Sequence, residues 1–149
     1  MATAPTSSLR VTLRRVYRKP RSEVFRAWTD PKELKRWWGP PGVESPSVEV
    51  DLRVGGRYRF AMRKLPDGQP FFVTGIYREI VAGERLVFTW NWESGGPPLG
   101  SNTLVTIEFH DAAAGTEIVL THERFESDEA RDKHIEGWNG CFESLEALL

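Results

Sequence analysis

The sequence has little of several features that mark common classes of protein. It contains one cysteine, Cys141, so no disulfide can form within the chain. It has no apolar run long enough to span a membrane and no basic and apolar leader typical of a signal peptide. The formal net charge is only −1, with basic and acidic residues interleaved, so the chain offers no cationic field for nucleic acid. We therefore expect a cytoplasmic protein with no nucleic-acid or membrane partner.

Motifs for catalysis and cofactor binding are also missing. No nucleophile elbow, phosphate-binding loop or dinucleotide fingerprint occurs. The glycine-containing segment "VGGRYRF" is too short for such a motif and lies between strands, so we expect its glycines to form a turn or bulge. The three histidines lack a metal-ligand spacing, and Cys141 has no basic partner that the sequence predicts. The sequence thus predicts no catalytic residue, no metal site and no cofactor.

The length of 149 residues, with 40% apolar and 28% charged side chains, fits one globular domain. The opening "MATAPTSS" is polar and small, so we expect a disordered lead over residues 1–8 and a single domain over 9–149.

The first part of the chain predicts one strand and two short helices. Apolar residues alternate with polar ones over about 9–17, which indicates a strand with one buried face. Pro20 suits the start of a helix over "RSEVFRAWT". Asp30 is a good N-cap with Pro31 at the first helical position, and this second helix must end near Trp38 because "GPP" follows.

From residue 47 the period of the pattern changes to two. Six strands follow one another, separated by turns at 54–56, 66–68, 82–84, 94–102 and 112–115, which predicts an antiparallel meander. Ser127 can then cap a long helix with an apolar face. The predicted order is β-α-α-β-β-β-β-β-β-α, an α+β fold with a curved antiparallel sheet wrapped around the C-terminal helix.

Two glycines lie inside that long helix, in "EGWNGCFESL". Each costs about 1 kcal/mol relative to alanine, so something must compensate. Gly137 and Gly140 either let the helix pack closely on a bulky sheet or open space beside Trp138 for a bound apolar molecule, and both explanations can hold together.

Several segments in the same order carry a family resemblance. They are "VFRAWTDPKELKRWWGP", "DLRVGGRYRF", "GIYREIVAGERLVFTW" and "GTEIVLTHERF", followed by "ARDKHIEGWNGCFESLEALL". Over about residues 9–149 the chain resembles stand-alone prokaryotic proteins related to the C-terminal domain of the activator of the heat-shock-protein 90 ATPase, in the START and birch-pollen-allergen (SRPBCC) superfamily. The resemblance implies a helix-grip fold with an internal cavity between the sheet and the helix.

The candidate ligand-binding residues come from the inward faces of this fold and from the tryptophan pair before "GPP". We expect one tryptophan of that pair to plug the core and the other to gate the cavity. The candidates are Trp37, Trp38, Phe60, Met62, Tyr77, Trp90, His122, His134, Trp138 and Cys141.

Two of these candidates, His122 and His134, are expected to meet inside the cavity. Strand alternation turns one inward and helical spacing turns the other. They are satisfied core residues, polar anchors for a ligand, or a general base. Desolvation and mutual repulsion would lower the pKa of both rings.

The preferred function is binding of a small hydrophobic or amphipathic molecule in the cavity. One alternative, from the resemblance, is a chaperone co-regulator, although two-domain activators carry an additional N-terminal domain for which a first strand near residue 9 leaves no room. Another is a cyclase-like or hydrolase-like enzyme acting on an aromatic or polyketide-like molecule. Phe71 and Phe72 at a strand start could support a homodimer.

Overall fold

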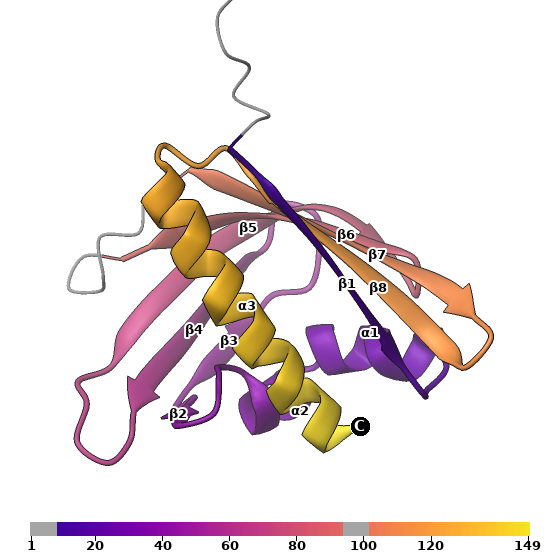
Figure 1. Cartoon of the computed structure of the whole chain (residues 1–149), viewed down its shortest axis with the longest axis horizontal. Helices are drawn as coiled ribbons and strands as arrows, with labels where there is room; N and C mark the ends of the chain where they lie inside the picture. The colour runs from indigo at the N-terminus through magenta and orange to yellow at the C-terminus, as the bar shows by residue number, and fades with distance from the viewer. Residues whose placement is uncertain (1–8, 94–101) are drawn as a thin grey trace, which may run out of the picture.

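A curved antiparallel sheet crossed by a long C-terminal helix makes up the fold in the computed structural model, which describes residues 9–93 and 102–149 (Figure 1). In chain order its elements are β1 (Val11–Tyr17), α1 (Arg21–Thr29), α2 (Pro31–Trp37), β2 (Val43–Glu44), β3 (Val48–Val50), β4 (Arg57–Lys64), β5 (Phe71–Val81), β6 (Arg85–Trp92), β7 (Thr103–Ala112), β8 (Gly115–Glu123) and α3 (Asp128–Leu148). The predicted lead at 1–8 and most of the predicted turn at 94–102 lie outside the described residues.

The sheet has the predicted meander. Its order is β1-β8-β7-β6-β5-β4-β2, with β3 also paired to β4, and all pairs are antiparallel. The helix-grip prediction is therefore confirmed. The sequence missed β2, in which Val43 pairs with Lys64 and Glu44 with Arg63, because a strand of two residues is too short to show alternation.

The helix ends follow the predicted capping chemistry. The Asp30 carboxylate accepts a hydrogen bond from the backbone N–H of Lys32 at 2.9 Å, and the Ser127 hydroxyl accepts one from Ala130 at 3.1 Å. Each cap satisfies a backbone donor that the first turn of a helix leaves free. After α2, Gly39 has a φ of +105°, a conformation that favours glycine and turns the chain away from the helix axis.

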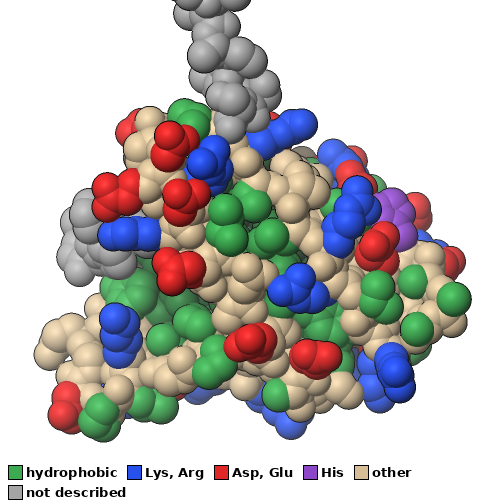
Figure 2. Space-filling model, viewed as in Figure 1, with side chains coloured by type: hydrophobic (Ala, Val, Ile, Leu, Met, Phe, Trp, Pro, Cys, Tyr) green, Lys and Arg blue, Asp and Glu red, His purple; other side chains and the backbone are tan. Residues whose placement is uncertain are grey.

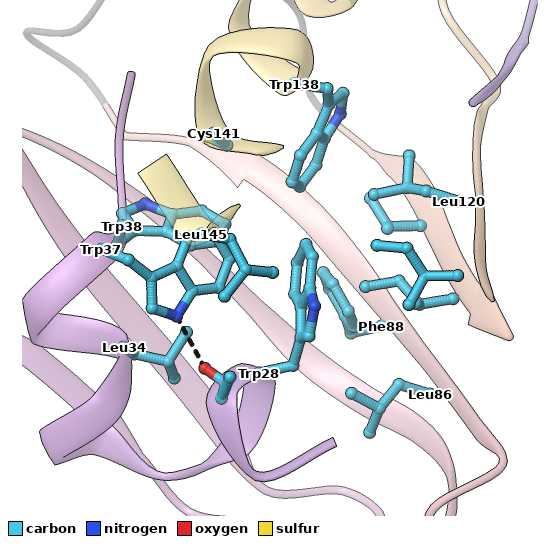
Figure 3. Packing of buried hydrophobic residues seen from close by; sticks show 14 of the residues in the cluster. Trp28, Leu34, Trp37, Trp38, Leu86, Phe88, Leu120, Trp138, Cys141 and Leu145 are labelled. Carbon is cyan, nitrogen blue, oxygen red and sulfur yellow. Dashed lines mark hydrogen bonds between the residues drawn. The ribbon is translucent and has the colours of Figure 1, made fainter. Parts of the chain in front are cut away.

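The core lies between α3 and the concave face of the sheet, and α1 and α2 close it near the C-terminal end of α3 (Figure 1). Trp28, Trp37 and Trp38 are all at most 3% exposed and pack edge to face. Figure 3 shows how this group from α1 and the end of α2 approaches Trp138 and Cys141 of α3. The two short helices thus bring aromatic side chains under the long one.

Candidate functional site

A small apolar pocket opens between the middle of α3 and the inner faces of β4, β5 and β6. Its volume is about 150 Å³. In Figure 2, hydrophobic side chains gather in a hollow along the edge of α3 that faces β4 and β5. The residues that line it are Trp38, Pro40, Met62, Phe71, Trp90, Trp92, Lys133, His134, Gly137, Trp138 and Cys141.

Six of the ten candidate residues line this pocket, namely Trp38, Met62, Trp90, His134, Trp138 and Cys141. Three others lie one layer behind it. Trp37 and Phe60 pack on Trp38 with ring centroids 5.4 and 4.7 Å away, and His122 accepts a hydrogen bond from Trp138. These three residues contact the side chains that line the pocket and do not line it themselves.

Tyr77 is the candidate that neither lines the pocket nor packs on a ring that lines it. It is 2% exposed and packs on Tyr58 and Phe88. Its strand, β5, has a register shift against β6 between Tyr77 and Glu79. Strand alternation identified its inward face correctly but could not indicate how far along the sheet the pocket extends.

The two tryptophans after α2 have different surroundings. The Trp37 indole N–H donates to the backbone carbonyl of Ala27 at 2.8 Å, the dashed contact in Figure 3, which makes Trp37 part of the core. The Trp38 indole N–H is buried and has no hydrogen-bond partner among the described residues. Trp38 also lines the pocket, but its indole N–H is shielded from solvent and is an unsatisfied buried donor.

The two helix glycines also differ. A Cβ on Gly140 would lie 2.4 Å from the Cβ of Pro40, so Gly140 allows α3 to pack against the segment after α2. A Cβ on Gly137 would meet nothing within 4 Å, and Gly137 lines the pocket. Close packing of the helix therefore explains Gly140, and open space beside the pocket explains Gly137.

His134 connects α3 to β6. Its Nδ1 lies 2.7 Å from the Ala130 carbonyl oxygen, so Nδ1 carries the proton and donates. Its Nε2 accepts from the indole N–H groups of Trp90 and Trp92 at 3.3 and 3.0 Å. An Nε2 that accepts two hydrogen bonds cannot also carry a proton, so the ring is neutral.

His122 connects β8 to both α3 and β7. Its Nδ1 accepts from the Trp138 indole N–H at 3.0 Å, so Nε2 carries the proton and donates to the Thr103 hydroxyl at 2.8 Å. The Thr103 hydroxyl in turn donates to the Trp90 carbonyl at 3.0 Å. Each polar side-chain group in this series of hydrogen bonds has a partner in the protein, as buried polar groups require.

Burial also keeps both rings neutral. Desolvation lowers the pKa of His122 well below its usual value, and the nearby His134 lowers it further. Desolvation lowers the pKa of His134 as well, although the Ala130 carbonyl opposes this shift. Because all four ring nitrogens already have partners, neither histidine can take a proton from a bound molecule without breaking an internal contact.

The remaining groups give little support for catalysis or metal binding. Burial raises the pKa of the Cys141 thiol to about 12, so the thiol is protonated and a poor nucleophile near neutral pH. Over residues 9–93 and 102–149, no group of three or more His, Cys, Asp or Glu side chains is arranged to hold a metal ion. In the same part of the chain, no helix combines the length and apolar character that crossing a membrane requires.

Five lining residues were not among the candidates, namely Pro40, Phe71, Trp92, Lys133 and Gly137. The sequence had indicated open space at Gly137, and two more carried usable signals. Trp92 follows the inward alternation of β6, and Lys133 lies four residues before Gly137 on α3, so both positions could have been assigned to this face. Phe71, predicted as a dimer edge, lines the pocket, while Phe72 lies under the Arg59 guanidinium at 3.7 Å. Both phenylalanines therefore have partners within the chain.

A wider depression of about 620 Å³ lies on the opposite face of the sheet. Its wall includes Arg59, whose guanidinium makes two hydrogen bonds to the Glu93 carboxylate at 2.8 and 3.0 Å. Charged side chains of both signs line this depression, so its walls are more polar than those of the pocket beside α3.

Comparison with known proteins identifies one family. The family model described as "Activator of Hsp90 ATPase homolog 1-like protein" matches residues 18–149. A search of curated proteins found no significant match.

Solved bacterial structures share the fold over nearly the whole chain. Protein CV1439 from Chromobacterium violaceum is 28% identical with a TM-score of 0.82, covering 94% of this chain and 96% of its own. Protein NE0264 from Nitrosomonas europaea is 27% identical with a TM-score of 0.79, covering 96% and 95%. The AHSA1 protein SPO3351 from Silicibacter pomeroyi is 26% identical with a TM-score of 0.80, covering 93% and 95%.

Proposed function

The chain belongs to the activator of Hsp90 ATPase homolog 1-like family, and from this premise we propose that it binds a small hydrophobic or amphipathic molecule between the sheet and α3. One observation carries the proposal. The pocket is walled by five aromatic side chains from the sheet, α3 and the end of α2, with an opening beside Gly137. An apolar concave site with few polar groups is the usual form of a small-molecule site.

The size of the pocket restricts the ligand. Sites for drug-sized molecules measure about 300 to 1,000 Å³, whereas this pocket measures about 150 Å³. An apolar cavity of about 150 Å³ accommodates a molecule of the size of benzene. The pocket therefore favours a molecule with one ring over a long acyl chain or a polyketide-like molecule of several rings.

The polar network favours binding over catalysis. His122 and His134 are neutral and fully hydrogen-bonded, and the thiol of Cys141 is protonated near neutral pH. A general base needs a free nitrogen within hydrogen-bond reach of its substrate. These side chains instead give the pocket a rigid wall.

A titration with benzyl alcohol tests the proposal, with intrinsic tryptophan fluorescence as the readout. We expect saturable quenching, because Trp38, Trp90, Trp92 and Trp138 line the pocket. Gly137→Leu should remove most of this quenching, since its side chain would grow into open space while leucine suits a helix.

Glu143→Leu is the matched control, because it adds the same side chain at an exposed position of the same helix. This variant should bind as the unmodified protein does. Absence of saturable binding, or equal binding by Gly137→Leu and the unmodified protein, would contradict the proposed function.

The family description also names a chaperone ATPase, which gives a separate assay. Adding the protein to an Hsp90 ATPase reaction should leave the rate unchanged if small-molecule binding is its function. A stimulated rate that Gly137→Leu retains would instead support the co-regulator.

A further inference from the structure

Among the described lining residues, Lys133 has the polar group that a ligand can reach, because the indole, imidazole and thiol groups are buried or already hydrogen-bonded. Lys133 lines the pocket from α3, and its side chain is 51% exposed. The Nε2 lone pair of His134 is already used by two indole N–H groups. A ligand that supplies acceptors would therefore match this wall better than one that supplies donors.

Lys133 is the residue that gives the pocket its charge. His134 is neutral, and the other described lining side chains are apolar, aromatic or a protonated thiol, so the described wall has a net charge of one positive unit. The partner of Lys133 is Glu129 at 3.4 Å, one turn earlier on the helix and 79% exposed. An exposed ion pair of this kind contributes little free energy. The Lys133 ammonium can therefore leave Glu129 and pair with a ligand at little cost in free energy.

The aromatic walls also attract cations through their ring faces. However, an ammonium inside the pocket would lie among apolar rings without a carboxylate among the described lining residues, and Lys133 would repel it. Burying an unpaired charge is costly. A carboxylate avoids that cost, because its ring can fill the pocket while the charged group stays beside Lys133 at the exposed edge.

We propose that the pocket selects small one-ring aromatic carboxylates, with the ring between Trp38, Trp90 and Trp138 and the carboxylate paired with Lys133. This inference rests on the proposed binding function and adds the class and orientation of the ligand. The pocket volume of about 150 Å³ limits the apolar part to a single ring. The charge of Lys133 decides which single-ring molecules bind best.

Three probes of nearly equal size test this selection, namely benzoate, benzyl alcohol and benzylamine. Their dissociation constants are measured at neutral pH by tryptophan fluorescence, with indole N–H signals followed by NMR. Benzoate should bind about two- to fivefold more tightly than benzyl alcohol, the range expected for one partly exposed ion pair. Benzylamine should bind most weakly, and 0.5 M NaCl should reduce the preference for benzoate.

Variants of the ion pair assign the preference to one side chain. Lys133→Gln should bring the benzoate and benzyl alcohol affinities close together, because the neutral amide cannot pair with the carboxylate. Glu129→Gln removes the competing carboxylate and should strengthen benzoate binding. Lys32→Gln, at an exposed position on α2, is the control and should retain the full preference.

The outcomes separate this inference from the function on which it rests. If benzyl alcohol binds but benzoate binds no better, or if Lys133→Gln keeps the preference, the inference is wrong and the binding function stands. If benzylamine binds best, the rings rather than Lys133 govern selection, and the inference is also wrong. If none of the three probes binds, both proposals fail.

Discussion

The rings of His122 on β8 and His134 on α3 lie 4.8 Å apart, centroid to centroid, in a perpendicular arrangement. Each ring accepts at least one indole N–H across the boundary between the sheet and the helix. Trp138 of α3 donates to His122, and Trp90 and Trp92 of β6 donate to His134. This pair therefore holds α3 on the sheet through hydrogen bonds in addition to apolar contacts.

The first prediction concerns the pH dependence of stability. Both histidines have a lowered pKa in the folded protein, whereas in the unfolded chain they titrate near about 6.5. Below that pH the unfolded chain binds more protons than the folded protein, so the free energy of unfolding must decrease as the pH falls. The slope is at most about 1.4 kcal/mol per pH unit for each histidine.

Urea unfolding at several pH values between 7.5 and about 4.5 measures this slope. His122→Gln should lower stability overall but reduce the slope, because one of the two titrating groups is gone. A free energy of unfolding that does not change between pH 7 and 5 would contradict the assignment of both histidines as buried and neutral.

The second prediction concerns Thr103, whose hydroxyl joins His122 to the Trp90 carbonyl. Thr103→Val keeps the shape of the side chain but leaves one buried donor and one buried acceptor unpaired. We expect a loss of about 1 to 3 kcal/mol in the free energy of unfolding. Thr106→Val, at a half-buried position of the same strand on the opposite face, should change stability by less than about 0.5 kcal/mol.

The third prediction compares the helix glycines by replacing each with alanine. Gly137→Ala should stabilise the protein by up to about 1 kcal/mol, because its Cβ has free space and alanine favours the helix. Gly140→Ala should destabilise it by about 1 to 3 kcal/mol, because its Cβ would overlap the ring of Pro40. Equal effects of the two changes in thermal or urea unfolding would show that the helix does not lie as described.

The fourth prediction concerns the two indoles that share the Nε2 of His134. Trp92→Phe leaves this nitrogen with the donor from Trp90, so hydrogen-bond loss alone should cost less than about 1 kcal/mol. Changing both tryptophans to phenylalanine leaves the Nε2 lone pair buried without a donor. The double variant should therefore lose more stability than the sum of the single variants, which a double-mutant cycle measures.

The double variant also has a signature beyond stability. Without indole donors, Nε2 of His134 is free to accept a proton, so the pKa of this histidine should rise toward its usual range. NMR titration of the imidazole in the single and double variants distinguishes this effect from simple loosening of the core. A pKa that is equally low in all variants would show that the indole donors do not influence protonation.

The sequence by itself determined the local structure of this protein. Asp30 and Ser127 mark helix starts because capping depends on neighbouring residues only, and alternation placed residues such as Trp90 and His122 on an inward face. The order of the elements and the linked motifs were sufficient to indicate the helix-grip fold. Each of these signals is carried by residues that are close together in the chain.

Only the tertiary structure decided which inward residues reach the pocket and which groups they hydrogen-bond. Alternation could not distinguish Trp90, which lines the pocket, from Tyr77, which lies elsewhere along the sheet. The roles of Trp37 and Trp38 differ because one indole reaches the Ala27 carbonyl and the other does not. These differences depend on register, curvature and the path of α3, which are set by contacts between residues far apart in the sequence.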